Sequence, residues 1–216
     1  MINQLKKVID QKHKPEELNR LFVLSAGQYR RNLPCVNLLL KLGVGINAVN
    51  AVGDTAVSQA VYCCEAIVKV LIGAGADVNI GNRINTPLIR ATCIKGNIKI
   101  VQALIDAGAC PNVDDSQGRT PLINAILNND IEMLKVLMVG GAKVDFINRH
   151  GRTALLWAIQ REDINIEIVK ILINAGADPA IVNSVGKAAL DYAHDSGNQE
   201  VIQLIEDALS KKLITL

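Results

Sequence analysis

The residues from 104 to 125 contain, in order, the end of one helix, a tight turn and the start of another helix. Gly108 follows an apolar stripe and stands where a helix needs a left-handed residue to satisfy its last carbonyl groups. Asp115-Ser-Gln-Gly118 predicts a tight turn, because glycine readily adopts the positive φ that short hairpins demand. Thr120 is expected to cap the next helix, and the proline that follows it suits the first helical position. Each local choice agrees with the next, which is typical of a sequence that specifies one structure.

The segment that begins at Gly108 recurs along the chain with nearly constant spacing. Its copies lie at 75–79, 108–112, 141–145 and 176–180, and a looser copy lies at 43–47. The last residues of the five copies are 32, 33, 33 and 35 residues apart. Five copies in register predict a chain built from one structural unit of about 33 residues.

A period of this length, with Thr-Pro-Leu opening the first helix at 86–88 and 120–122, resembles the ankyrin repeat. The resemblance extends over nearly the whole chain. It implies an all-α solenoid of about six stacked helix-turn-helix repeats, joined by short β-hairpin loops and including degenerate repeats at the ends. It also implies a protein-binding module whose partners contact the hairpin tips and the exposed side of each first helix.

We expect one ankyrin-repeat domain over 1–216. Its expected parts are an N-terminal helix with a degenerate first repeat at 1–49, repeats at 50–81, 82–114, 115–147 and 148–182, and a C-terminal capping repeat at 183–216. The repeat at 82–114 lacks its turn glycine, and we expect Asn85 to adopt the left-handed conformation there instead. End repeats are atypical because one of their faces meets water.

One position departs from the ankyrin pattern. Members usually carry a histidine after Thr-Pro-Leu, where it links neighbouring repeats by hydrogen bonds. Here that position holds Ser58, Ile89, Ile123, Leu156 and Asp191. We therefore expect the cohesion between repeats to depend on apolar burial at these positions.

The balance of charge and the cysteine content narrow the class of protein. Lys and Arg number 23 against 21 Asp and Glu, so a formal charge of +2 does not indicate general affinity for nucleic acid or membranes. The first residues lack the apolar core of a signal peptide, and no apolar run approaches the roughly 18–20 residues of a membrane span. Five irregularly spaced cysteines fit a reducing compartment. We expect a soluble, cytoplasmic monomer.

No catalytic arrangement of residues is evident. The three histidines, His13, His150 and His194, fall in an N-terminal segment, at a hairpin tip and in a late helix. Catalysis requires mutually positioned groups, so we expect no enzymatic activity, no bound metal and no cofactor.

The cysteines near two inter-helix turns leave an alternative open. Cys63 and Cys64 lie in one repeat and Cys93 in the next, so their sulfurs could approach one another in a zinc site or redox pair. The C-x₂-C spacing typical of zinc sites is absent. Cysteine as a small apolar filler is the commoner role.

Asn79 is a candidate for modification. Its surroundings, Leu71 followed by Asp77-Val-Asn79, resemble the context that an asparaginyl hydroxylase modifies in ankyrin repeats of animal cells. The alternative is that this asparagine simply belongs to the repeat consensus.

The resemblance places the binding surface in the concave groove of the solenoid. The residues expected to project into it, one before each buried alanine, are Ser25, Gln59, Arg90, Asn124, Trp157 and Tyr192. The residues between turn and cap are Asp54, Arg119, Arg152 and Lys187, and those expected at hairpin tips are Arg83, Arg149 and His150. Trp, Tyr and Arg dominate interface energies, so we predict a site around Trp157 and Tyr192. The alternative for Trp157 is a half-buried ring that fills space.

We predict a non-enzymatic scaffold or adaptor that binds another protein through this groove. Its C-terminal half is basic and aromatic, which favours an acidic partner segment that also carries an apolar anchor. One alternative is a recognition module of a secreted bacterial effector or of a larger enzyme complex. Binding of an anionic ligand or nucleic acid through the Arg and Lys residues is a less favoured alternative.

Overall fold

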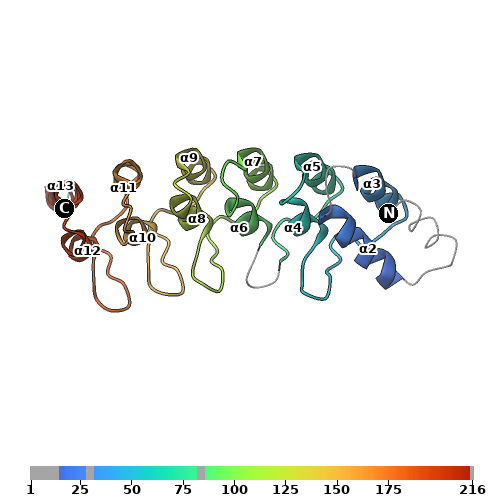
Figure 1. Ribbon diagram of the computed structural model, residues 1–216, viewed down its shortest axis with the longest axis horizontal. Coiled ribbons are helices and arrows are strands. Elements are labelled where there is room, and N and C mark those ends of the chain that lie inside the picture. The colour runs from blue at the N-terminus through green and yellow to red at the C-terminus, as the bar shows by residue number, and fades with distance from the viewer. Residues whose placement is uncertain (1–14, 28–31, 82–85, 215–216) are drawn as a thin grey trace. The chain divides into compact units, whose positions relative to one another are not determined.

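The computed structural model describes residues 15–27, 32–81 and 86–214, and it divides into two compact units, 1–110 and 111–216. Unit 1 contains α2 (Pro15–Gly27), α3 (Leu33–Lys41), α4 (Ala56–Ala60), α5 (Glu65–Gly73), α6 (Pro87–Thr92) and α7 (Ile98–Asp106). Unit 2 contains α8 (Pro121–Leu127), α9 (Ile131–Val139), α10 (Ala154–Ile159), α11 (Ile166–Asn174), α12 (Ala189–Ser196) and α13 (Gln199–Ile214). No residue in the described ranges forms a strand, which confirms the all-α prediction (Figure 1). The predictions for His13, Arg83 and Asn85 lie outside the described residues.

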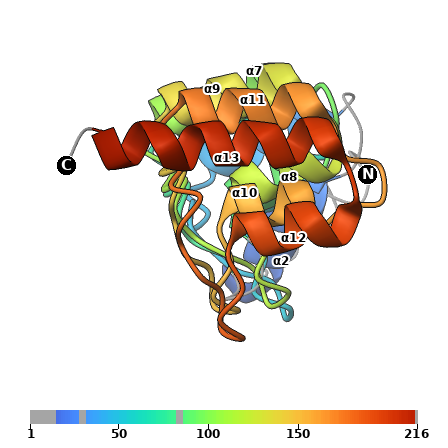
Figure 2. The same ribbon diagram turned by 90° about the vertical axis from the view of Figure 1, so that its left-hand side faces the viewer.

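Each unit is a stack of helix pairs arranged in two rows. In unit 1, α2, α4 and α6 contact one another in sequence, and so do α3, α5 and α7. In unit 2, one row contains α8, α10 and α12, and the other contains α9, α11 and α13 (Figures 1 and 2). In both units, the row formed by the first helix of each pair is called the inner row, and the row formed by the second helix is called the outer row. The loops extend from the inner row. Helices this short are marginal alone, so burial against neighbouring repeats supplies most of their stability.

The position that usually holds histidine is part of the core. Ser58, Ile89, Ile123 and Leu156 are each at most 1% exposed, as the prediction of burial at these positions requires. Asp191 differs because it is exposed. Its carboxylate accepts a hydrogen bond of 2.7 Å from the backbone N–H of Ala188, where the other repeats carry a threonine cap.

The predicted threonine caps are confirmed. Thr120 Oγ1 accepts a hydrogen bond of 3.1 Å from the backbone N–H three residues on, and Thr55, Thr86 and Thr153 do the same. This bond satisfies one of the free N–H groups that every helix start leaves.

The hairpin loops, defined as 50–54, 115–119, 148–152 and 183–187, are each built by the side chain of their first residue. In the loop 115–119, Asp115 Oδ1 accepts 2.8 Å hydrogen bonds from the N–H groups of Gln117 and Arg119. Gly118 has a φ of +73°, as predicted for this turn. Asn50, Asn148 and Asn183 form the same pair of bonds in the other loops. Short polar side chains are favoured in turns for this reason.

A second set of side chains, mostly asparagines, stands at the last position of each copy of the repeated glycine segment (75–79 and its equivalents). These side chains bond to the next copy along the chain. Asn79 accepts from the N–H of Cys110 at 2.9 Å and donates to the carbonyl of Gly108 at 3.0 Å. Asn112 makes the same two bonds to the loop at 141–143. Asn47 and Asp145 each accept one bond from the following repeat, at 2.8 and 2.9 Å. The repeated Asn therefore contributes cohesion that the sequence analysis did not predict, because its side-chain amide both donates to and accepts from the backbone of the next repeat.

The last copy of the repeated segment ends in Ala180, whose methyl side chain cannot form the hydrogen bonds of this series. Lys212 of α13 instead reaches back to Asp178, with its Nζ 2.6 Å from the carboxylate. Hydrogen bonds from Lys212, and then from the N–H of Ala180, hold the pKa of Asp178 below its usual value. The terminal helix is thus attached to the final loop by a charged contact.

A buried ion pair joins two repeats of unit 1. The guanidinium of Arg90 contacts both carboxylate oxygens of Asp54, which lies 36 residues earlier. Their side chains are 9% and 6% exposed. Gln59 donates a third hydrogen bond to Asp54 at 2.6 Å. Leaving either charge buried without its partner would be costly.

Replacing Asn112 by alanine should lower the free energy of unfolding by about 1–2 kcal/mol, since two hydrogen bonds between repeats are lost. Asn174→Ala is a matched control, because Asn174 is exposed at the end of α11. Urea unfolding followed by circular dichroism and by the fluorescence of the single tryptophan would measure both changes. Equal losses in the two variants would contradict a role for this asparagine in joining repeats.

Arg90→Met should lower the free energy of unfolding by about 3–5 kcal/mol, because it leaves the Asp54 carboxylate buried without its cation. The double variant Asp54→Asn/Arg90→Met should lose clearly less than the sum of the two single changes. A double-mutant cycle in urea measures this coupling. Additive losses would show that the two side chains stabilise the unit independently.

Candidate binding face

The residue before the helix cap and the residue five positions later interact in several repeats. In unit 1 this pair is Asp54 and Gln59, joined by the hydrogen bond described above. In unit 2 the guanidinium carbon of Arg152 lies 5.5 Å from the centre of the Trp157 ring. The Lys187 ammonium lies 5.4 Å from the ring of Tyr192. Both distances fall within the range of cation–π attraction.

The unit 1 candidates are engaged inside the unit. The expectation that Arg90 projects into a groove is wrong: the residue is 8% exposed because Asp54 holds its guanidinium. Gln59 is half-buried and bonded to the same carboxylate. Ser25 is 1% exposed and donates to the carbonyl of Phe22. No sequence signal identified the pair of Asp54 and Arg90, because its members lie in different repeats.

Asn124 is also misplaced by the sequence analysis. It is 3% exposed, and the α8 residues around it, 121–126, are all buried. The helix therefore has no exposed side at this point from which Asn124 could reach a partner.

Two arginines of the predicted site are neutralised by nearby aspartates. Arg119 Nε lies 2.9 Å from Asp115 Oδ2 within one hairpin loop. Arg149 contacts Asp114, which lies 35 residues earlier, with Nε 3.2 Å from Oδ2. Burial alone would raise the pKa of Asp114, but its hydrogen bonds and charge interaction with Arg149 outweigh that effect and lower it.

Trp157 is half-buried rather than broadly exposed, which agrees with the alternative considered for its ring. Its Nε1 is buried and has no hydrogen-bond partner among the residues that the structure describes. The guanidinium of Arg152 lies over the ring. Trp157 therefore presents only part of its surface to a partner.

Tyr192 and Lys187 form the corresponding group in the last repeat. The Tyr192 hydroxyl accepts a 2.6 Å hydrogen bond from Asn183 Nδ2, which fixes the ring. Lys187 Nζ lies 2.7 Å from the carboxylate of Asp195, one turn beyond Tyr192 on α12. The hydrogen bond to Asp195 raises the pKa of Lys187.

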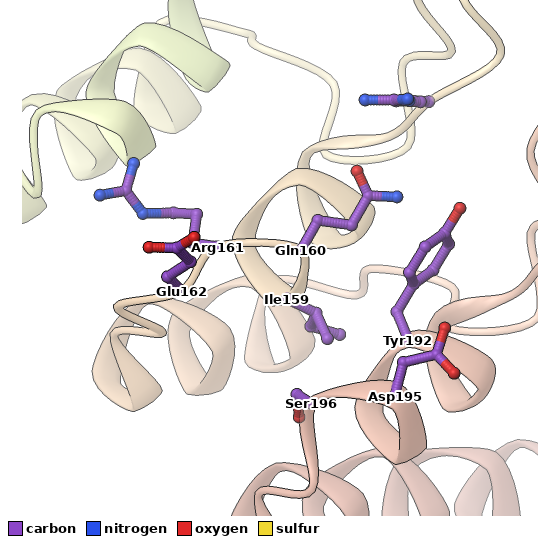
Figure 3. Close-up of a pocket in the computed structure, with 8 residues that line it drawn as sticks. Ile159, Gln160, Arg161, Glu162, Tyr192, Asp195 and Ser196 are labelled. Carbon is purple, nitrogen blue, oxygen red and sulfur yellow. The ribbon is translucent and has the colours of Figure 1, made fainter.

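Two shallow pockets lie beside these pairs in unit 2, and Arg152 lines both of them. The first, of about 500 Å³, lies along α10 and α12 and is lined by Arg152, Ile159, Gln160, Arg161, Glu162, Tyr192, Asp195 and Ser196 (Figure 3). The second, of about 540 Å³, lies between hairpin loops and is lined by Gln117, Arg149, His150, Gly151, Arg152, Trp157 and Ser184. In Figure 3, Tyr192 and Asp195 face the first pocket from the side opposite Arg161 and Glu162. The i, i+3 spacing of Tyr192 and Asp195 on one helix could have identified Asp195 from the sequence.

We call the surface made by the three hairpin loops of unit 2 and these two pockets the hairpin face. It brings together six residues of the predicted set: Arg119, Arg149, Arg152, Trp157, Lys187 and Tyr192. It excludes the buried Asn124, while Gln59 and Arg90 belong to unit 1.

The cysteines are free, and Cys63 Sγ donates to the carbonyl of Gly27 at 2.8 Å. The described part of the chain holds no cluster of three or more His, Cys, Asp or Glu side chains suited to a metal ion. None of the helices described there has the length and apolar character needed to cross a membrane.

Asn79 uses both ends of its side-chain amide in the bonds to Gly108 and Cys110. Those bonds supply a structural reason for asparagine at this position in the repeat. Hydroxylation of Asn79 stays a prediction.

Comparison with known proteins agrees with this architecture. A family model described as three copies of the ankyrin repeat matches residues 81–148 and 125–213, and a single-repeat ankyrin model matches 52–83. A search of curated proteins finds no match.

Several solved structures are similar over most of their length. An ankyrin-repeat domain from Acinetobacter baumannii is 28% identical with a TM-score of 0.76, over 87% of this chain and 96% of that one. Another ankyrin-repeat protein is 28% identical with a TM-score of 0.74, over 86% and 96% of the two chains. A chain from the complex of a predatory endopeptidase of Bdellovibrio bacteriovorus with an immunity protein is 26% identical with a TM-score of 0.70, over 88% and 96%.

The family models together span residues 52–213, well over half of the 216 residues. The repeated helix pairs, threonine caps and hairpin loops described above lie in the same region. The chain therefore belongs to the ankyrin-repeat family.

Proposed function

We propose that this protein is a non-enzymatic scaffold or adaptor whose partner protein binds the hairpin face of unit 2. The observation that carries the proposal is the pair of adjacent pockets that share Arg152 and are lined by Trp157 and Tyr192. Ankyrin repeats are general protein-interaction modules, so family membership supports binding as the class of function. Aromatic and arginine side chains are the types that contribute most to protein interfaces.

Unit 2 is favoured over unit 1 as the binding site because side chains at equivalent repeat positions bond to one another in unit 1 but are available to a partner in unit 2. In unit 1, Gln59 and Arg90 both donate hydrogen bonds to the Asp54 carboxylate. In unit 2, Arg152 and Trp157 pair by a cation–π contact that leaves the guanidinium's hydrogen-bond donors available to a partner. A segment carrying an acidic residue and an apolar anchor suits this combination of charge and ring surface.

The anchor would gain from the apolar surface near the rings. Tyr192 lines the pocket along α10 and α12, Trp157 lines the pocket between the hairpin loops, and Val185 is exposed on the last hairpin loop. Five free cysteines fit a reducing compartment, so we place the interaction inside a cell.

A second candidate is a role as the binding partner of an enzyme. One similar chain comes from a solved complex of an endopeptidase with an immunity protein. If this chain acts likewise, the captured partner should be an enzyme whose activity changes when the hairpin face is occupied. An assay of the captured partner with and without this protein separates this role from that of a simple adaptor.

The variant Arg152→Glu should abolish or strongly reduce capture of the native partner from cells that produce the protein, because it places a negative charge between the two pockets. Lys135→Glu is the matched control, since Lys135 is exposed on α9 of the outer row. Quantitative mass spectrometry of proteins retained by each variant measures the difference. Loss of the partner with Lys135→Glu but not with Arg152→Glu would move the binding surface to the outer row.

Trp157→Ala should lower the free energy of unfolding by about 1–3 kcal/mol, less than the roughly 3–5 kcal/mol of a fully buried aromatic residue, because the ring is half-buried. The same variant should weaken partner binding by about 2 kcal/mol or more if the ring contributes to the interface. Chemical unfolding and a binding titration on one preparation measure both quantities. Unchanged binding in a folded variant would restrict Trp157 to packing.

A further inference from the structure

The cations around the hairpin face differ in whether a carboxylate of the same chain neutralises them. The neutralised pairs are Arg119–Asp115, Arg149–Asp114, Arg161–Asp163 and Lys187–Asp195. Arg152 has no ion-pair partner among residues 15–27, 32–81 and 86–214, and its side chain contacts the Trp157 ring instead. Arg152 and Lys187 occupy equivalent positions, yet only Arg152 keeps a charge that another molecule can neutralise.

The position of Arg152 is fixed before any partner binds. Its backbone N–H donates to Asn148 Oδ1 at 2.9 Å, and its carbonyl accepts from the Asn148 N–H at 3.1 Å. These bonds close the hairpin loop, while the Trp157 ring supports the guanidinium from one face. A planar guanidinium held in this way loses little freedom when it forms two parallel hydrogen bonds to a carboxylate.

The two pockets that Arg152 lines differ in charge. The pocket along α10 and α12 contains the carboxyl groups of Glu162 and Asp195. The pocket between the hairpin loops has no acidic lining residue, and Gln117, His150 and Ser184 supply further polar groups there. An anionic group is therefore favoured in the pocket between the loops.

We propose that Arg152 is the carboxylate receptor of the hairpin face, and that it binds the side chain of a Glu or Asp within the partner segment. This inference rests on the proposed function and assigns its charge recognition to one residue. Arg152 lines both pockets, so a partner segment that fills both of them runs past Arg152. Residues of the segment then lie on both sides of the residue that contacts Arg152. An internal acidic side chain fits that arrangement, whereas a chain terminus does not. Trp157 is then a positioning residue that supports the guanidinium.

The test begins with random twelve-residue peptides, all amidated at the C-terminus, selected against the full chain. Peptides that bind should share an acidic residue at one position. Fluorescein-labelled copies of a selected peptide, with Glu or with Gln at that position, give affinities by anisotropy. Arg152→Gln should weaken binding of the Glu peptide at least about tenfold, the effect expected when a hydrogen-bonded charge pair is broken. Lys187→Gln should weaken it less, and Lys135→Gln is the control outside the face.

A charge exchange tests direct contact. Arg152→Glu should bind a peptide with Lys at the acidic position better than it binds the original, which reverses the preference of the native chain. For Trp157, the readout is the ratio of affinities for the Glu and Gln peptides. Trp157→Leu should lower that ratio, and Trp157→Phe should restore it, because a ring is retained beneath Arg152.

The outcomes separate this inference from the proposed function. Selection of no peptide would overturn the proposed function, and this inference with it. Peptides without an acidic preference, or with one that survives Arg152→Gln, would overturn the role of Arg152 while leaving peptide binding intact. A free-acid copy of the selected peptide, with Gln at the acidic position, tests the assignment to an internal side chain. If that copy bound as tightly as the amidated Glu peptide, the assignment would be overturned.

Discussion

The hydrogen bonds between each Asn-ended loop and the loop of the next repeat fix the register in which the repeats of each unit stack, while apolar burial supplies most of the stability. Asn79 and Asn112 each donate to one carbonyl and accept from one N–H of the following repeat. The histidine that usually links ankyrin repeats is absent, and apolar burial at its position has no directional preference. The asparagines therefore supply the register that burial alone would leave loosely defined.

The position before the helix cap and the position five residues later hold repeats together in unit 1, whereas in unit 2 they are available to bind a partner. Asp54 before the α4 cap draws Gln59 and Arg90 into a closed, buried network. Arg152 before the α10 cap cannot do so, because its neighbour five residues on is Trp157, which attracts a cation without neutralising it. The position before the cap is acidic in Asp54, which joins two repeats, and basic in Arg152, which is a surface group that can bind a partner.

Much of the fold could be predicted from short-range patterns. The Thr120 cap and the Gly118 turn occur where the sequence indicated them, because their geometry depends only on residues within a few positions. The candidate site was predicted less well. Arg90 is buried because Asp54, 36 residues earlier, holds its guanidinium, and Asn124 is buried in a helix whose residues 121–126 are all buried.

The sequence by itself determined the repeat family, the helix starts at the threonine caps and the repeat positions from which a binding face is drawn, because a 33-residue period repeats local geometry. Only the tertiary structure decided which cations keep an available charge. Lys187 and Arg152 are equivalent in the repeat, but Asp195 reaches the first and no carboxylate in the described residues pairs with the second. Such pairing depends on distances between side chains across turns and repeats, and the period of the sequence does not encode those distances.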